Sequence, residues 1–227
     1  MVVKKLIRKV DAFSDLEEKT ISRISEIAEE VNLKKGETLF WEKDQVDAVY
    51  ALVSGKAAML RYSGSGQKRI FFILNEGSLI NEVAFDNLPV SVVCEAFEPA
   101  KLLRFSKIEF LDIMRDDFDL TYNIMCSMGK KQRRLYRQLK NTVPIKVDKK
   151  LAAKLWKLSK DYGVLEGEWI RIDLKMSVTN LSYLMGSSRE TISRALKLLI
   201  DESIVKWDNK QLLVKESDIL DYYRNES

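Results

Sequence analysis

The sequence contains no histidine, and it has only 2 cysteines, 3 prolines and 9 glycines in 227 residues. Without histidine, Ser–His triads, His-based acid–base pairs, His-ligated haem and most zinc sites are excluded. Cys94 and Cys126 offer neither a disulfide framework nor metal-ligand spacing. Few prolines and glycines exclude fibrous and low-complexity classes. We therefore expect no enzyme, no catalytic residue, no cofactor and no metal site.

Long apolar runs are also missing. No run approaches the roughly 18 apolar residues of a membrane span, and residues 1–13 have lysines but no apolar secretory core. Hydrophobic residues make up 46% of the chain, which suits a globular core. These features predict a soluble, cytoplasmic protein of bacterial type. The net charge of +4 is too mild to indicate nucleic-acid binding, so any basic face must come from arrangement.

The stretch from Gly186 to Leu199 predicts a turn followed by a helix with Ser188 as its N-cap. One helical face is apolar and can pack inward; it holds Ile192, Ala195, Leu196 and Leu199. The opposite face carries Arg189, Glu190, Ser193 and Arg194, near the N-terminal end. Arginine can bond bidentately to guanine and glutamate can accept from cytosine. This stretch therefore predicts a DNA recognition helix.

A first helix is expected over residues 177–185, with Ser177 as the candidate N-cap and with an apolar face. Gly186 suits the left-handed conformation that ends such a helix and turns the chain. The two helices together predict a helix-turn-helix. A surface helical hairpin with solvated charges is the alternative, but it does not explain why Arg189, Glu190 and Arg194 gather at one end.

The residues from Ser188 to Arg194 resemble the recognition helix of the Crp/Fnr transcription regulators. The resemblance implies that Arg189, Glu190 and Arg194 read a half-site similar to TGTGA. Ser193 resembles instead the serine of the Fnr branch, which reads TTGAT-like half-sites. The sequence mixes both signatures and leaves both half-sites open. The four-cysteine iron–sulfur pattern of the Fnr branch is absent.

Short strand-like runs separated by turn residues fill the region from residue 31 to residue 105. The clearest runs are 38–41, 48–53, 57–62, 69–74, 91–96 and 101–105. They predict a β-sandwich or barrel, here a jelly roll, preceded by a short helix over residues 14–30. The segment 63–68 has part of a phosphate-loop pattern without its full spacing, so we expect a hairpin turn there.

Residues 35–40 and 50–56 resemble the cyclic-nucleotide-binding type of β-roll. In such domains a Gly-Glu pair holds ribose and an Arg-Ser pair caps the cyclic phosphate. By resemblance Asn81 and Glu82 take the first pair, whereas Val90 and Ser91 take the second and lack its arginine. A buried phosphate without its charge partner is costly. We expect an effector other than cyclic AMP, or none.

A long helix is predicted over residues 117–141, after a short one over 106–115. Its apolar positions alternate by three and four residues, which is an a/d seam with one polar member: Met125, Met128, Gln132, Leu135 and Leu139. We interpret it as a parallel dimerisation helix; packing against the chain's own β-roll is the alternative. An effector pocket between roll and helix would be lined by Asn81, Glu82, Ser91, Gln132, Leu135 and Tyr136.

The basic end of this helix, residues 130–140, fits the helix dipole, and phosphate contact is the alternative. The segment 142–144 breaks the helix and is expected to act as a hinge. Beyond it we expect a helix over 148–162, a strand over 169–174, the two motif helices, and a hairpin of 204–207 and 211–214. This is a winged helix-turn-helix, with Lys206 and Lys210 as candidate phosphate contacts.

The sequence thus predicts an α+β chain with three parts: a sensor domain over 1–116, a dimerisation helix and hinge over 117–144, and a DNA-binding domain over 145–227. We expect a homodimer on double-stranded DNA at an inverted repeat, with RNA polymerase and an unknown small effector as further partners. Two alternatives stay open: a cyclic-nucleotide-binding subunit acting on a protein partner, and an effector-independent DNA-binding regulator. Redox sensing by Cys94 or Cys126 is a further possibility, with burial as small apolar residues the alternative.

Overall fold

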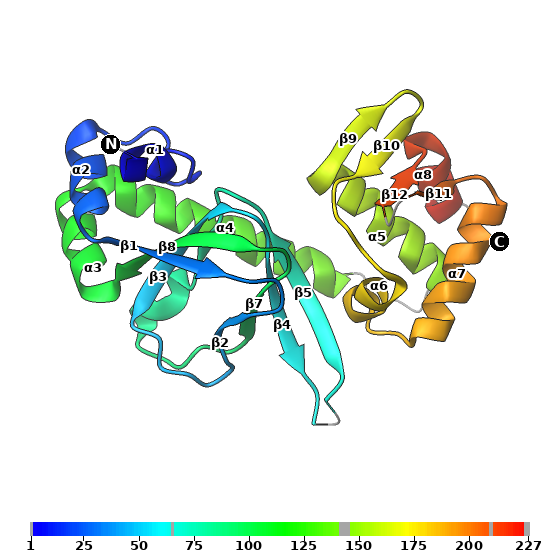
Figure 1. Ribbon diagram of the computed structural model, residues 1–227, viewed down its shortest axis with the longest axis horizontal. Helices are drawn as coiled ribbons and strands as arrows, with labels where there is room; N and C mark the ends of the chain where they lie inside the picture. The colour runs from blue at the N-terminus through cyan, green and yellow to red at the C-terminus, as the bar shows by residue number, and fades with distance from the viewer. Residues whose placement is uncertain (1, 65, 141–145, 209–210, 225–227) are drawn as a thin grey trace. The chain divides into compact units, whose positions relative to one another are not determined.

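Figure 1 presents the chain as a computed structural model, which describes residues 2–64, 66–140, 146–208 and 211–224. The chain divides into two compact units, residues 1–142 and 143–227. In chain order the elements are α1 (Val2–Ile7), α2 (Glu18–Glu26), β1 (Ala28–Leu33), β2 (Thr38–Phe40), β3 (Ala48–Ser54), β4 (Ala57–Tyr62), β5 (Lys68–Leu74), β6 (Leu79–Ile80), the 3-10 helix η1 (Glu82–Asp86), β7 (Val93–Ala96), β8 (Ala100–Ser106), α3 (Lys107–Asp116), α4 (Phe118–Lys140), α5 (Val147–Tyr162), β9 (Gly163–Glu166), β10 (Trp169–Ile172), α6 (Val178–Met185), α7 (Arg189–Asp201), β11 (Val205–Asp208), β12 (Gln211–Val214) and α8 (Glu216–Arg224).

The first unit contains two four-stranded antiparallel sheets, with strand orders β1-β8-β3-β6 and β2-β7-β4-β5. This confirms the predicted N-terminal β-roll. β3 is buried along almost its whole length because its alternate residues belong to two different apolar clusters, one on each face of the strand. At the expected hairpin turn between β4 and β5, the backbone N–H of Ser63 donates to the carbonyl of Gln67 over 2.9 Å. Ser65, in the same turn, lies outside the described residues.

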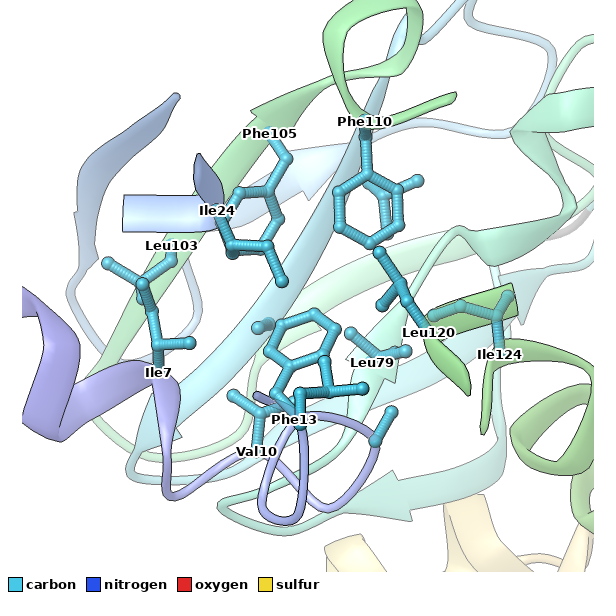
Figure 2. Close-up of a cluster of buried hydrophobic side chains, with 14 of the residues drawn as sticks. Ile7, Val10, Phe13, Ile24, Leu79, Leu103, Phe105, Phe110, Leu120 and Ile124 are labelled. Carbon is cyan, nitrogen blue, oxygen red and sulfur yellow. The ribbon is translucent and has the colours of Figure 1, made fainter. Parts of the chain in front are cut away.

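A cluster of buried apolar side chains joins the roll to its helices (Figure 2). Phe105 of β8 packs against Phe110 of α3, with ring centroids 5.4 Å apart, and against Phe13, with centroids 5.9 Å apart. Leu120 and Ile124 of α4 belong to the same cluster. Burial of such side chains contributes about 1.5–3 kcal/mol each, so the first turns of α4 are firmly fixed to the roll.

Glycine is required at one turn of the roll. Gly55, between β3 and β4, has a φ of +78°, and an added Cβ would lie 2.0 Å from the carbonyl oxygen of Pro99. A side chain here would be strained by its backbone conformation and would also collide with a neighbouring backbone. Gly55 therefore lets two turns of the roll approach closely.

The predicted helix over residues 14–30 is wrong at both ends. The structure has α2 over Glu18–Glu26, and the segment from Ala28 onward forms the edge strand β1. β1 pairs with β8, where Arg104 forms an ion pair with Glu29 over 2.7 Å and Lys101 one with Glu30 over 2.8 Å. These cross-strand pairs stabilise β1 as a strand despite the local helical pattern. The local sequence does not show them because the partner strand is distant in sequence. The other predicted boundaries shift by one or two residues.

The second unit has the expected winged helix-turn-helix and two further elements, β9 and α8. One four-stranded sheet, in the order β11-β12-β10-β9, unites the predicted hairpin with the predicted strand, which ends at Ile172. β9 was not expected, and neither was α8, which packs against α5. In the first unit α1 was likewise not expected. The helix α5 buries Leu151, Leu155 and Leu158 on one face, and its bounds agree with the predicted helix over 148–162 to within one residue.

Candidate nucleic-acid interface

The first motif helix, α6, begins at a capping box. The Ser177 hydroxyl accepts from the backbone N–H of Asn180 over 3.1 Å, and the Asn180 side chain accepts from the backbone N–H of Ser177 over 2.9 Å. The serine cap was predicted, but the reciprocal role of Asn180 was missed, because an asparagine at this position is rarer in capping boxes than glutamate or glutamine. Leu181 and Leu184 are buried and hold α6 against its neighbours.

A tight turn connects α6 to α7. Gly186 ends α6 with a φ of +63°, and its backbone N–H donates to the carbonyl of Ser182, as the predicted left-handed cap requires. Ser188 then begins α7, because its hydroxyl accepts from the backbone N–H of Thr191 over 3.1 Å. Both predicted caps are confirmed. They fix where α7 starts, and therefore which side chains lie on its first two turns.

α7 has one buried face and one exposed face, as predicted. The buried face holds Ile192, Ala195, Leu196 and Leu199. The exposed face holds Arg189, Glu190, Ser193 and Arg194, and it continues for one turn with Lys197. Lys197 was not among the predicted contacts, although its spacing of four residues from Ser193 places it on the same face. The helix thus presents three cations and one acid on a single exposed surface.

Two of these side chains already contact each other. Arg194 Nη2 donates to Glu190 Oε1 over 3.0 Å, and both side chains are more than 70% exposed. Such a surface pair contributes only about 0–1 kcal/mol, whereas a good base contact discriminates by about 1–3 kcal/mol. The pair holds both side chains at the exposed face. Because the pair is weak, either group can exchange it for a hydrogen bond to a DNA base at little cost in free energy.

Of the two candidate phosphate contacts in the wing, Lys206 lies within the described residues. Lys206 on β11 is exposed, and its Nζ lies 4.1 Å from the centre of the Trp169 ring. This cation–π contact holds the stem of the lysine in place and leaves its ammonium group near the surface. Lys210, the second candidate, lies outside the described residues.

The first unit contains a buried carboxylate at the position expected to hold a ligand. Glu82 is only 3% exposed at its side chain; its Oε2 accepts from Lys131 Nζ over 2.5 Å, and its Oε1 accepts from Ser127 Oγ over 3.0 Å. Both partners lie on α4. Lys131 Nζ also donates to the carbonyl of Leu79 over 2.7 Å. The carboxylate is therefore fully engaged by the chain's own side chains.

Comparison with known proteins agrees with both units. A model of the cyclic nucleotide-binding domain matches residues 30–117, and one of the Crp-like helix-turn-helix domain matches residues 149–221. A CRP-like cAMP-activated global transcriptional regulator of Mycobacterium tuberculosis is 20% identical over 216 residues, covering 95% of this chain and 96% of its own. The cyclic AMP receptor protein of Thermus thermophilus is 26% identical over 189 residues, covering 82% and 84%.

Among solved structures, FixK2 from Bradyrhizobium japonicum covers 88% of this chain and 100% of its own with a TM-score of 0.74, at 16% identity. That likeness shows a shared fold. The two matched domains follow one another along this chain, and the relatives match it over most of their own length, so the assignment follows. The chain belongs to the Crp/Fnr family. It is a Crp-like transcription regulator with a helix-turn-helix DNA-binding domain, as its sequence predicted.

In this Crp/Fnr protein the residue before Glu82 adopts the left-handed conformation. Asn81 has a φ of +65°, and its side-chain amide donates to the carbonyl of Ala48 over 2.9 Å. Asparagine is one of the few residues besides glycine that tolerates this conformation, which explains how it can replace glycine here. Val90, at the arginine position of the family pattern, is buried, and the neighbouring Ser91 is exposed.

The six candidate effector residues are not gathered into one site of the single chain. Asn81 and Glu82 are buried in the roll, whereas Gln132, Leu135 and Tyr136 are exposed on α4. Gln132 Nε2 donates to the hydroxyl of Tyr136 over 3.0 Å on that exposed face. Lys131 and Ser127 are the α4 residues that reach Glu82. Neither residue was predicted, because each lies more than forty residues from Glu82 in the sequence and the contact leaves no local pattern.

α4 of this family member presents an exposed stripe opposite its buried residues. Of the predicted seam, Met125, Met128, Gln132 and Leu135 are all exposed, while the side chain of Leu139 lies outside the described residues. Phe118 and Tyr122 extend the stripe toward the start of α4 and are 73% and 54% exposed, with ring centroids 6.4 Å apart. Large exposed apolar side chains in a row indicate an interface.

The two cysteines lie in different surroundings. Burial raises the pKa of the Cys94 thiol to about 12, so this group stays a neutral thiol. Cys126 on α4 is half-buried. Across the described ranges no cluster of three or more Cys, Asp or Glu residues could hold a metal ion. In that same part of the chain, the helices are all too short or too polar to span a bilayer.

Proposed function

We propose that the protein is a homodimeric transcription regulator that binds an inverted-repeat DNA site through α7. The main support for DNA binding is the exposed face of α7, where Arg189, Glu190 and Arg194 lie in the first two turns after the Ser188 cap. The N-terminal residues of a recognition helix contact base edges, and these residue types match guanine and cytosine edges. The half-site is TGTGA-like or TTGAT-like. Ser193 would take part in reading the half-site, as the serine of the Fnr branch does, and Ser188 and the wing lysines Lys206 and Lys210 would add sugar and phosphate contacts.

The homodimer would form through α4. Its exposed stripe of Met125, Met128, Gln132 and Leu135 has the spacing of a coiled-coil seam. Phe118 and Tyr122 lengthen that seam by two turns. A parallel pair of α4 helices would bury these side chains and present two copies of α7, which a palindromic site requires at one helical turn of spacing.

The three predicted parts would have separate functions: a sensor over residues 1–116, the dimerisation helix and hinge over 117–144, and the DNA-binding domain over 145–227. The hinge at 142–144 lies outside the described residues. The effector would differ from cyclic AMP, since Val90 offers no charge for a phosphate and Lys131 already neutralises Glu82. RNA polymerase would be the further partner, and action on chromosomal DNA would place the protein in the cytoplasm.

An effector-independent regulator is the second candidate. The Glu82–Lys131 pair favours it, because the chain itself supplies a cation where a ligand would otherwise be held. In that case the dimer would be competent for DNA without any small molecule. A cyclic-nucleotide-binding subunit with a protein partner would instead show tight nucleotide binding and no sequence-specific DNA affinity.

Selection of the ligand-free protein against a random duplex DNA pool, at near-physiological salt, tests the proposal. We expect enrichment of an inverted repeat, whose half-sites decide between the two motifs. Enrichment without any additive would favour the effector-independent candidate; enrichment only with cell extract would favour the effector-controlled one. DNA retained without any enriched sequence in both conditions would contradict the proposal.

Arg189→Ala tests the base-reading role directly. We expect a loss of about 1–3 kcal/mol on the selected site and relaxed preference at one base position, measured by fluorescence anisotropy. Arg115→Ala, which removes an exposed arginine of α3, should leave affinity unchanged. An equal loss for Arg189→Ala on selected and random DNA would show that Arg189 contacts only phosphate.

A further inference from the structure

A cavity lies beside α4, on a different face of the helix from its exposed stripe. Its volume is about 230 Å³. Three segments form its walls: the residues after α1, the turn between β5 and β6, and α4 itself. The lining residues of α4 are Asn123, Cys126, Ser127, Lys130, Lys131 and Arg134. We propose that this cavity binds a small organic anion carrying a phosphate or carboxylate group.

The charges around the cavity are unequal. Lys130, Lys131 and Arg134 line it, against Asp11 as the single acid among its lining residues. Lys131 is balanced by the buried carboxylate of Glu82. Together with Glu82, the charged side chains at the cavity are three cations and two acids, and this net positive charge favours an anion over a neutral or cationic ligand. Arginine and lysine are the side chains that proteins use to hold carboxylates and phosphates.

Helix geometry keeps these groups in fixed positions. Cys126, Lys130 and Arg134 follow one another at intervals of four residues and therefore form one row on α4. The guanidinium carbon of Arg134 lies 4.8 Å from the centre of the Phe72 ring, which holds this cation against β5. Lys130 forms no hydrogen bond or ion pair with the described residues, so its ammonium group is available to a ligand.

The remaining wall is polar and preformed. Asn123 Nδ2 donates to the carbonyl of Ala12 over 3.1 Å, and the backbone N–H of Asp11 donates to the carbonyl of Gly77 over 3.0 Å. These bonds tie the three walls together without a ligand. A volume of about 230 Å³ lies below the roughly 300–1,000 Å³ of pockets for drug-sized ligands, which suits a metabolite of a few carbons.

The position of the cavity gives the ligand a means of control, and this consequence rests on the proposed function. Cys126 lines the cavity and lies one turn after Tyr122, which belongs to the exposed stripe. A ligand that draws Lys130 and Arg134 inward acts on the same helix that would form the dimer. Binding that differs between two positions of α4 would shift the equilibrium between them.

Isothermal titration calorimetry of the full chain, without DNA, tests the binding site independently of the DNA-binding proposal. The probes are glycerol 3-phosphate, succinate and, as an uncharged control, glycerol. We expect saturable binding of at least one of the two anions, with weaker binding at higher salt, and no binding of glycerol. Binding of glycerol 3-phosphate alone would identify a phosphate site, and binding of succinate alone a carboxylate site. Absence of binding by both anions would overturn the proposal.

Lys130→Glu should weaken anion binding by about tenfold or more, as expected for loss of a charged hydrogen bond. Lys19→Glu, an identical charge change on an exposed residue of α2, should leave binding within about twofold, since distant surface charges are screened. Equal weakening by both variants, or displacement of the anion by cyclic AMP, would overturn the site. Sequence-specific DNA binding, measured separately, can fail or succeed without affecting either result.

Discussion

The carboxylate of Glu82 depends on one ammonium group for its charge balance. Lys131→Met would leave this carboxylate buried with only the Ser127 hydroxyl, which should cost about 3–5 kcal/mol of the free energy of unfolding. Glu82→Gln removes the charge itself and leaves the half-buried Lys131 with the Leu79 carbonyl, which should cost at most about 1–3 kcal/mol. Urea unfolding followed by circular dichroism measures both. Equal losses would show that the pair is not held in a buried environment.

Residue roles that rest on neighbours in sequence could be predicted here, and roles that rest on distant partners could not. Ser188 and Gly186 were read correctly because a cap involves residues within one helical turn. Glu82 was singled out only through a family pattern. Its partner Lys131 was assigned to the basic end of a helix, since nothing local distinguishes it from the lysine and arginines around it.

At the scale of elements, α4 begins at a cap that also sets a pH dependence. Burial acts to raise the pKa of Asp117, but hydrogen bonds from the Thr20 hydroxyl and the backbone N–H of Leu120 outweigh it and hold the pKa below its ordinary value. A lowered carboxyl pKa stabilises the fold above the unfolded pKa of about 4, and this stability is lost as pH falls through the folded pKa.

Asp117→Ala should therefore lower stability by about 1 kcal/mol at pH 7, and the difference from the natural chain should shrink toward pH 3. Thermal unfolding at a series of pH values measures it. Asp119→Ala, which removes an exposed acid from the first turn of the same helix, is the matched control and should cost less. A difference that stays constant with pH would exclude Asp117 as a titrating cap.

Elements with a strong internal period were found from the sequence with boundaries shifted by only one or two residues. α4 and α5 are long and amphipathic, so their stripes were visible in the sequence. The first half of β1, residues 28–30, was read as helix because its acids resemble a solvated helical face, and only pairing with β8 makes it a strand. The short α1, β9 and α8 carry too few residues to show a period, and packing within the fold decides them.

At the scale of the whole molecule, the proposed dimer should be disrupted by a charge placed in the α4 seam. Met125→Glu would place two like charges in the seam, so light scattering should show a monomer at concentrations where the natural chain is dimeric. Binding to the selected inverted repeat should weaken at least tenfold as a result. Ile108→Glu, at an apolar residue of α3 that is even more exposed than Met125, should change neither mass nor DNA binding. A dimer that persists in Met125→Glu would place the interface elsewhere.

Dimerisation through the exposed stripe of α4, as proposed, would also make promoter occupancy depend steeply on the amount of protein. A surface that is covered only by a second copy makes the active species scale with the square of chain concentration when the protein is dilute. A modest rise in synthesis would then give a larger rise in promoter occupancy. A regulator that acts on its own gene would acquire a threshold from this one helix face, with no additional ligand or partner.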